Sequence, residues 1–280
     1  MKISPIIQTE ELLGLPKGNL VIVDAGSGKP AYENYLQKHL EGALYVDLNT
    51  DLAEIPVNAK NGGRHPLPSL EKFAEVLQKL GINYDSHVVI YDDKNGSNAA
   101  ARFWWMLKSV GIKKVQVLDG GLQTAERIGF PTQTKIPKTR PVEKLSLNEW
   151  KLPLVDINFI EKKSEKPGFL VIDVREKDRY DGKIEPIDEL AGHIPGAKNF
   201  PFKENLNEDG TFKSPEDLKK MYKEFFENFS SENIAIHCGS GVTACHTLLT
   251  LDYAGFEIPN LYIGSWSEWS RNNKFIAKNT

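Results

Sequence analysis

Short apolar runs alternate along the chain with longer stretches in which apolar positions recur at a helical period. Residues 20–24, 88–92, 169–173 and 234–238 are such runs, and each ends at Asp or Cys. Short runs of this kind are typical of parallel strands that are buried on both faces. Residues 69–80 carry apolar side chains at positions 70, 73, 76, 77 and 80, which predicts a helix. The pattern therefore predicts an α/β fold with mainly parallel sheets flanked by helices.

The second half of the chain repeats the first in the same order. Residues 20–24 resemble 169–173, and the segment that starts at His39 is echoed by the segment that starts at His193. The run that ends at Asp92 corresponds to the run that ends at Cys238. A carboxylate cannot perform the covalent chemistry of a thiolate, and it repels anions. We therefore expect a duplicated domain in which only the second copy has kept the chemistry.

Turn and capping residues divide each half into elements. Ser214 is expected to cap a helix that reaches residue 226, and further helices are expected over 99–110 and 244–254. Four prolines within 131–153 indicate a linker. We place the first domain at 1–138, the linker at 139–153 and the second domain at 154–280. Polar stretches 53–68 and 182–196 are predicted to be loops.

Composition narrows the possible functions. The 280 residues are 40% hydrophobic and 26% charged, with a net charge of −3, which gives no warrant for nucleic acid as a partner. No stretch approaches the roughly 20 apolar residues of a membrane span, and no leader of signal length is evident. The two cysteines, Cys238 and Cys245, do not form a disulfide framework or a metal-ligand set. These features suit a protein of the reducing cytoplasm that needs no metal or cofactor.

Cys238 lies on the turn around which the candidate chemistry is organised. Gly239, Ser240 and Gly241 interrupt the strand before it, and a helix is expected directly after the turn. Backbone N–H groups converge on such a strand-to-helix turn, and the positive end of the helix lies beneath it. Both effects favour a thiolate. A small buried cysteine with a packing role is the alternative interpretation.

Two other cysteine chemistries fit the turn less well. A cysteine phosphatase needs an arginine six positions after the cysteine to hold the phosphoryl oxygens, and Ala244 stands there. A cysteine protease needs a His base and a third polar group, and a tight turn suits a small group better than a peptide. A thiolate ringed by N–H donors is well suited to carry a terminal sulfur as a persulfide.

The tandem repeat, the loop from Cys238 to Ala244, Gly192-His-Ile-Pro-Gly196, Asp173-Val-Arg175 and Gly264-Ser-Trp-Ser-Glu-Trp269 together resemble the two-domain rhodaneses. The 3-mercaptopyruvate sulfurtransferase branch is the most similar. The resemblance covers nearly the whole chain. It implies two rhodanese-like domains, of which the second is catalytic and the first has Asp92 at the place of the nucleophile.

The resemblance also assigns roles to single residues. Cys238 matches the nucleophile that forms the persulfide, and Arg179 matches the arginine that binds the anionic end of the substrate. Ser240 and His65 resemble the hydroxyl and imidazole that relay a proton in mercaptopyruvate enzymes. The loop that cradles the sulfur corresponds to Gly239, Gly241, Val242 and Thr243, with Ser240 between them. We expect structural roles for Arg175, His237 and His246.

Two departures from the branch divide the evidence on the sulfur donor. Asn49 stands where mercaptopyruvate enzymes have an acid near the relay, and Asp188 stands where they have a second substrate arginine. The missing cation points toward thiosulfate-using relatives, although Lys183 could replace it. Those relatives carry basic residues in the cysteine loop, whereas Gly239 and Ser240 are neutral. The loop lies nearest to the sulfur, so we favour 3-mercaptopyruvate.

The resemblance thus implies a sulfurtransferase that moves a sulfane sulfur through a Cys238 persulfide. The acceptor is expected to be a thiol, thioredoxin among the candidates, or cyanide. A non-enzymatic persulfide carrier or interaction module is the alternative. The intact Gly239-Ser240-Gly241 turn and Arg179 argue against that alternative.

Overall fold

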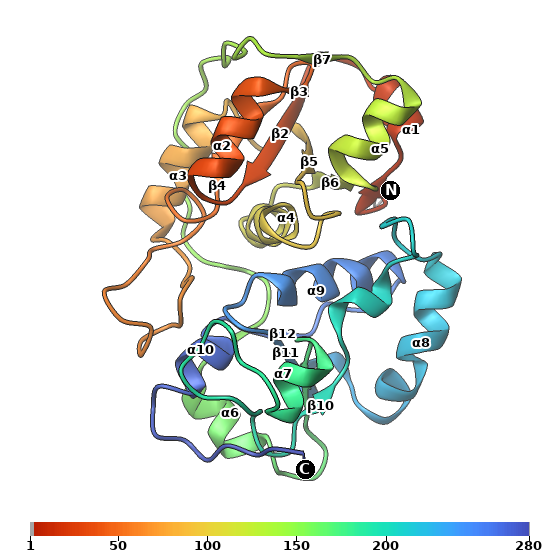
Figure 1. The fold of residues 1–280 in the computed structure, drawn as a ribbon. Coiled ribbons are helices and arrows are strands. Elements are labelled where there is room, and N and C mark those ends of the chain that lie inside the picture. The colour runs from red at the N-terminus through yellow and green to blue at the C-terminus, as the bar shows by residue number, and fades with distance from the viewer. Residues whose placement is uncertain (1–2, 280) are drawn as a thin grey trace. The chain divides into compact units, whose positions relative to one another are not determined.

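The computed structural model of the protein describes residues 3–279, which form two compact units (Figure 1). The first unit comprises the chain up to Glu54 together with Pro68–Lys151 and Glu208–Thr211. The second comprises Ile55–Leu67, Leu152–Asn207 and the chain from Phe212 onward. Residues 55–67 thus precede most of the first unit's sequence and yet belong to the second unit. His65 is one of residues 55–67, so it belongs to the second unit.

The first unit is built on a five-stranded parallel sheet with the strand order β1-β6-β5-β2-β4. Its strands are β1 Ile6–Ile7, β2 Leu20–Gly26, β4 Leu44–Asp47, β5 His87–Tyr91 and β6 Lys114–Leu118, with a small antiparallel pair β3 His39–Leu40 and β7 Thr132–Gln133. Its helices are α1 Thr9–Leu13, α2 Gly28–Gln37, α3 Leu70–Lys79, α4 Ala99–Ser109 and α5 Gly121–Ile128.

The second unit has its own five-stranded parallel sheet, with the order β10-β9-β11-β12-β8. Its strands are β8 Leu154–Val155, β9 Leu170–Asp173, β10 Lys198–Asn199, β11 Ile234–His237 and β12 Asn260–Tyr262. Its helices are α6 Ile157–Lys163, α7 Lys177–Asp181, α8 Pro215–Asn228, α9 Thr243–Tyr253 and α10 Ser265–Trp269, with 3-10 turns at Phe202–Asn205 and Ser231–Asn233. The predicted α/β class with mainly parallel sheets is confirmed.

The duplication is visible in single contacts as well as in strand order. Read from the opposite edge, the first sheet runs β4-β2-β5-β6-β1, which matches the second strand for strand. His39 stacks on Tyr35 with ring centroids 4.0 Å apart, and its Nδ1 lies 2.6 Å from the Tyr35 carbonyl oxygen. His193 makes the same pair of contacts with Tyr180, at 3.8 and 2.8 Å. Both histidines therefore have structural roles that the repeat preserves.

Local sequence signals account for where the helices begin. Ser214 caps α8 by accepting the Asp217 N–H at 3.1 Å, as predicted, and Pro215 opens the helix. Ser69 caps α3 in the same way. The helix α9 is buried all round, including Thr247 and Thr250. A helix enclosed on every side does not need an amphipathic pattern.

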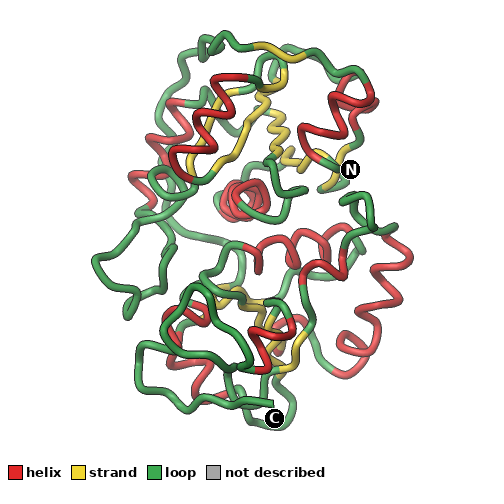
Figure 2. The backbone as a smooth tube through the Cα atoms, viewed as in Figure 1, coloured by secondary structure: helices red, strands yellow, loops and turns green. Residues whose placement is uncertain are grey.

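The segments predicted to be loops contain no long element. Residues 53–68 and 182–196 lack helices and strands, and the chain from 134 to 153 is drawn as loop throughout (Figure 2). The absence of helix in 134–153 follows from the prolines at 137, 141 and 153, which cannot donate a backbone hydrogen bond. Within residues 3–279, no helix has the length and apolar character that crossing a membrane requires.

Candidate functional site

Cys238 follows the last residue of β11 and is fixed by the segment that forms α10. Its N–H donates to Ser265 Oγ at 3.2 Å, and its carbonyl accepts the Trp266 N–H at 3.0 Å. Gly239 continues the pairing, because its carbonyl accepts the Ser267 N–H at 2.9 Å. Gly241 has a φ of +72°, and a Cβ there would lie 2.5 Å from the Ile263 carbonyl oxygen. The turn therefore requires glycine at 241 on both conformational and steric grounds.

The corresponding turn of the first unit surrounds a carboxyl group with backbone N–H groups, which oppose the rise that burial causes in the pKa of Asp92. The buried Asp92 carboxylate accepts four backbone N–H groups, from Lys94 and Gly96 at 2.8 Å and from Asn98 and Ala100 at 3.1 Å. Convergent N–H groups of this kind form an anion-binding nest. In the first copy the side chain of Asp92 itself fills the nest.

His65 and Ser240 meet beside the cysteine turn. The Nδ1 of His65 lies 2.8 Å from the Oγ of Ser240, which is a hydrogen-bond distance. Ser240 is buried and His65 is partly buried. The structure thus brings together the two residues that the sequence proposes as a proton relay, within the second unit.

The turn that carries His65 is anchored to α10 rather than to its neighbours in sequence. Glu268 accepts the Gly62 N–H at 2.7 Å and the Tyr262 hydroxyl at 2.8 Å. Ser267 Oγ accepts the Arg64 N–H at 3.0 Å. A Cβ at Gly63 would lie 2.3 Å from the Gly264 carbonyl oxygen, so this close approach requires glycine. One short helix therefore positions both the cysteine turn and the histidine turn.

Two arginines border the residue next to the cysteine. A Cβ at Gly239 would lie 3.1 Å from Nη2 of Arg64 and 3.5 Å from Nη2 of Arg179. Sequence reasoning proposes Arg179 and misses Arg64. The signal for Arg64 is its place directly before His65, because any turn that brings His65 to Ser240 also brings its neighbour close. Carboxylates and sulfonyl groups are the kinds of anion that guanidinium groups bind.

Two carboxylates on the loop after α7 hold these arginines. Glu185 accepts Arg179 Nη2 at 2.7 Å and Arg179 Nε at 3.2 Å. Asp188 binds the Arg64 guanidinium and accepts Arg271 Nη1 at 2.6 Å. Both carboxylates are buried. The arginine heads are thereby held in place, with their positive charges partly balanced.

Arg175 belongs to a structural network behind the turn. It binds Asp173 through Nε and Nη2, donates to the Gly192 carbonyl at 2.6 Å and stacks on Trp266 at 4.5 Å. Burial alone would raise the pKa of Asp173, but the charge of Arg175 holds that pKa below its usual range. Burial lowers the pKa of His237, which lies 3.7 Å from Asp173. The expected structural roles of Arg175 and His237 agree with these contacts.

The remaining candidates make local contacts. His246 stacks on Phe212 at 4.9 Å. Lys183 is largely exposed and pairs with Asp178 at 3.2 Å and Asp181 at 3.1 Å, so its charge is directed to those carboxylates rather than to the arginine pair. The N–H of Asn49 donates to Asp47 in the first unit at 2.8 Å. Val242 and Thr243 lie at the N-terminus of α9, directly after the turn.

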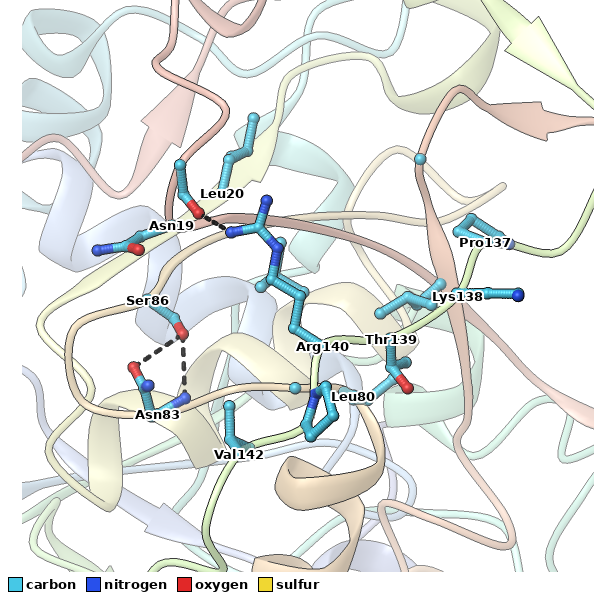
Figure 3. A pocket seen from close by; sticks show the side chains of 16 residues that line it. Asn19, Leu20, Leu80, Asn83, Ser86, Pro137, Lys138, Thr139, Arg140 and Val142 are labelled. Carbon is cyan, nitrogen blue, oxygen red and sulfur yellow. Dashed lines mark hydrogen bonds between the residues drawn. The ribbon is translucent and has the colours of Figure 1, made fainter.

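A pocket of about 310 Å³ in the first unit has a different character (Figure 3). Its lining includes Asn19, Asn83, Ser86 and Arg140, and no cysteine or histidine. Arg140 donates to the Gly18 carbonyl, while Ser86 and Asn83 bond to each other at 3.0 and 3.2 Å. The Arg140 bond ties the linker to the segment that precedes β2. The lining therefore offers no thiol nucleophile and no imidazole base.

Comparison with known proteins gives consistent results. The model for the rhodanese-like domain matches twice, over residues 8–126 and 157–272. A probable 3-mercaptopyruvate sulfurtransferase from Pseudomonas aeruginosa is 41% identical over 84% of this chain and 82% of its own length. The rat thiosulfate sulfurtransferase is 34% identical over 90% of this chain and 86% of its own. The crystal structure of SseA from Escherichia coli, one of the 3-mercaptopyruvate sulfotransferases, superposes with a TM-score of 0.76 at 29% identity, covering 95% of this chain and all of that one.

Proposed function

Because this chain belongs to the family of tandem rhodanese-like sulfurtransferases, we propose that Cys238 carries the sulfur as a persulfide and that 3-mercaptopyruvate is the preferred donor. The chain is a sulfurtransferase, as its named relatives are. In the proposal, residues 154–280 with the turn at 55–67 form the catalytic domain, the rest of 1–138 forms the non-catalytic one, and 139–153 link them.

The hydrogen bond between His65 and Ser240 is the observation that carries the choice of donor. When the Cys238 thiolate attacks the sulfur of 3-mercaptopyruvate, the C–S bond breaks and its electron pair leaves with the carbon as the enolate of pyruvate. The enolate must gain a proton, and the protonated persulfide can lose one. A hydroxyl bonded to an imidazole can carry that proton. When thiosulfate is the donor, sulfite is the leaving group, and no proton transfer to carbon is needed.

Two positive charges support binding of the donor at the same place. The guanidinium groups of Arg64 and Arg179 both border Gly239, directly beside the nucleophile. A carboxylate bound there would direct the remaining atoms of a small keto acid toward Cys238 and Ser240. Backbone N–H groups of the turn, such as those that hold Asp92 in the first unit, would stabilise the anionic persulfide.

The second step returns the enzyme to its starting state. A thiolate or cyanide attacks the outer sulfur of the persulfide, the S–S bond breaks, and Cys238 leaves as the thiolate. A small thiol, thioredoxin or cyanide fits this chemistry. Cys238 and Cys245 do not form a disulfide, which fits a reducing compartment such as the cytoplasm.

Side-by-side assays test this proposal. Pyruvate release from 3-mercaptopyruvate and sulfite release from thiosulfate would be measured for the wild type, Cys238→Ser and Cys245→Ser. We expect the wild type and Cys245→Ser to prefer 3-mercaptopyruvate, and Cys238→Ser to be inactive with both donors. A wild type that prefers thiosulfate would overturn the choice of donor. A carrier without enzymatic activity would form the persulfide once and then fail to pass sulfur to small thiols.

A further inference from the structure

Asp188 is a buried carboxylate surrounded by three arginines. Its side chain has no exposed surface, and its Oδ1 accepts from both Arg64 and Arg271. Its Oδ2 has no hydrogen-bond partner among the described residues, and Arg179 Nη2 lies 3.7 Å from it. Two of these three arginines border Gly239. The charge of Asp188 therefore acts on the groups nearest to the proposed anion site.

Glu185 fixes the position of Asp188. Its Oε1 accepts the backbone N–H groups of Ile187 and Asp188, both at 3.1 Å, in addition to the Arg179 guanidinium. Its Oε2 accepts Arg175 Nη1 at 3.2 Å. The loop is thus tied to the arginines by side chain and backbone together, and the carboxylates cannot turn away to solvent without breaking these bonds.

The charges in this cluster nearly cancel. Four guanidinium groups face three buried carboxylates, and these are Arg64, Arg175, Arg179 and Arg271 against Asp173, Glu185 and Asp188. Glu189 also approaches Arg271, at 3.7 Å, but its side chain is 77% exposed, so water screens it. The lowered pKa of His237 leaves that imidazole neutral near pH 7. The cluster therefore carries a net charge of one positive.

We propose that Asp188 is a specificity-determining residue that makes the site prefer donors with one negative charge over donors with two. The inference rests on the proposed function for the location of the anion site, and it reverses the expectation from the sequence that the missing cation at position 188 favours thiosulfate. At neutral pH the carboxylate of 3-mercaptopyruvate supplies one negative charge, whereas thiosulfate is a dianion. Whatever the protonation state of Cys238, thiosulfate leaves one more negative charge uncompensated at this cluster than the carboxylate does, and an uncompensated charge in a buried site is unfavourable.

Removing the charge of Asp188 should therefore favour the dianion. Asp188→Asn raises the net charge of the cluster from one to two positive while keeping the shape of the side chain. Attraction to a dianion then grows twice as much as attraction to a monoanion. We expect the affinity for thiosulfate relative to that for pyruvate to rise about tenfold at low salt, and the gain to shrink as salt is added.

Binding to a protein that cannot turn over separates this inference from the proposed function. Dissociation constants for pyruvate and thiosulfate would be measured by calorimetry on Cys238→Ser and on Cys238→Ser/Asp188→Asn. An unchanged ratio of the two constants would overturn the inference, and so would the absence of binding by either anion. A different measurement tests the proposed function: sulfur transfer by the Cys238→Ser variant would contradict it.

Arg271 provides the matched control, because it contacts Asp188, whereas the groups that lie closest to Gly239 belong to Arg64 and Arg179. Arg271→Gln lowers the net charge to zero and should shift the ratio away from thiosulfate. Combining it with Asp188→Asn restores one positive charge, and the ratio should return to within about threefold of the parent. If Asp188 acted only by positioning Arg64, each change would weaken the binding of the anions, and the double variant would show the sum of the two losses. That result would contradict the charge account.

Discussion

His65 Nδ1 lies 2.8 Å from Ser240 Oγ, although 175 positions separate the two residues in the chain. The contact depends on the turn at 62–65, which α10 holds through Glu268 and Ser267. The same helix fixes Cys238 through Ser265 and Trp266. Cys238, which is the proposed nucleophile, and the proposed proton relay are therefore positioned by one element, which sets their separation.

Replacing Ser240 by Ala should affect the two donors unequally. We expect kcat with 3-mercaptopyruvate to fall roughly 100-fold or more, because loss of a positioned proton carrier typically costs this much. Sulfite release from thiosulfate should change by less than about threefold, since that reaction needs no proton transfer to carbon. Steady-state assays with both donors check this. Equal losses with the two donors would show that Ser240 serves the turn rather than the relay.

His65→Gln should reproduce this pattern, because the two side chains are proposed to act as a unit. The double variant with Ser240→Ala should lose no more activity than either single variant. Strictly additive losses in kcat would contradict a shared relay.

Glu268 should be needed for the position of the histidine turn. Glu268→Ala removes both acceptor oxygens, so the Gly62 N–H and the Tyr262 hydroxyl each lose their acceptor. We expect a loss of about 1–3 kcal/mol in the free energy of unfolding and a fall in kcat with 3-mercaptopyruvate. Urea unfolding and kinetics measure the two effects. Tyr262→Phe removes only the hydrogen bond from the Tyr262 hydroxyl to Glu268 and leaves the bond from Gly62. This variant should therefore lose stability while keeping more activity.

Gly239 and Gly241 should respond to alanine in different ways. Gly239→Ala crowds the guanidinium groups of Arg64 and Arg179, so we expect KM for 3-mercaptopyruvate to rise about tenfold with little loss of stability. Gly241→Ala forces a positive φ on alanine and meets the Ile263 carbonyl, which should cost at least about 1–2 kcal/mol of stability. Thermal unfolding and kinetics distinguish the two. A destabilised Gly239→Ala with unchanged KM would contradict the placement of the arginines.

Asp24 should make the first unit less stable at alkaline pH. Burial raises its pKa to about 7, well above the value of about 4 expected in the unfolded chain. Between these values the folded state holds a proton that the unfolded state has lost, so stability falls as the pH rises from about 4 to 7. Asp24→Asn should therefore stabilise the protein at pH 8, by up to about 4 kcal/mol, and have little effect at pH 4.

Asp173 is the equivalent of Asp24 in the repeat and supplies the control. Its pKa lies below the usual range because Arg175 is paired with it, so Asp173→Asn should destabilise the protein at pH 8 by about 3–5 kcal/mol. Urea unfolding at the two pH values measures both variants. Equal effects of Asp24→Asn at pH 4 and pH 8 would contradict the account of Asp24.

The fold is predictable because its signals are local. Apolar runs mark the central strands, Ser214 marks the start of α8, and the repeat indicates two similar sheets. The site is predictable only where its residues lie on the cysteine turn or match a family motif. Arg64 escapes prediction because its role depends on the docking of a loop onto Ser267, which is 203 positions away. The partners of Asp188 are equally hidden, because burial among three arginines leaves no pattern in the sequence around it.

The most direct test of the account is the mass of the protein after reaction with 3-mercaptopyruvate in the absence of an acceptor. We predict that the wild type and Cys245→Ser each gain one sulfur atom, that peptide mapping places it on Cys238, and that a thiol then removes it. Cys238→Ser should gain none. Pyruvate release without sulfur on Cys238, or a sulfur that maps to Cys245, would contradict a Cys238 persulfide as the intermediate.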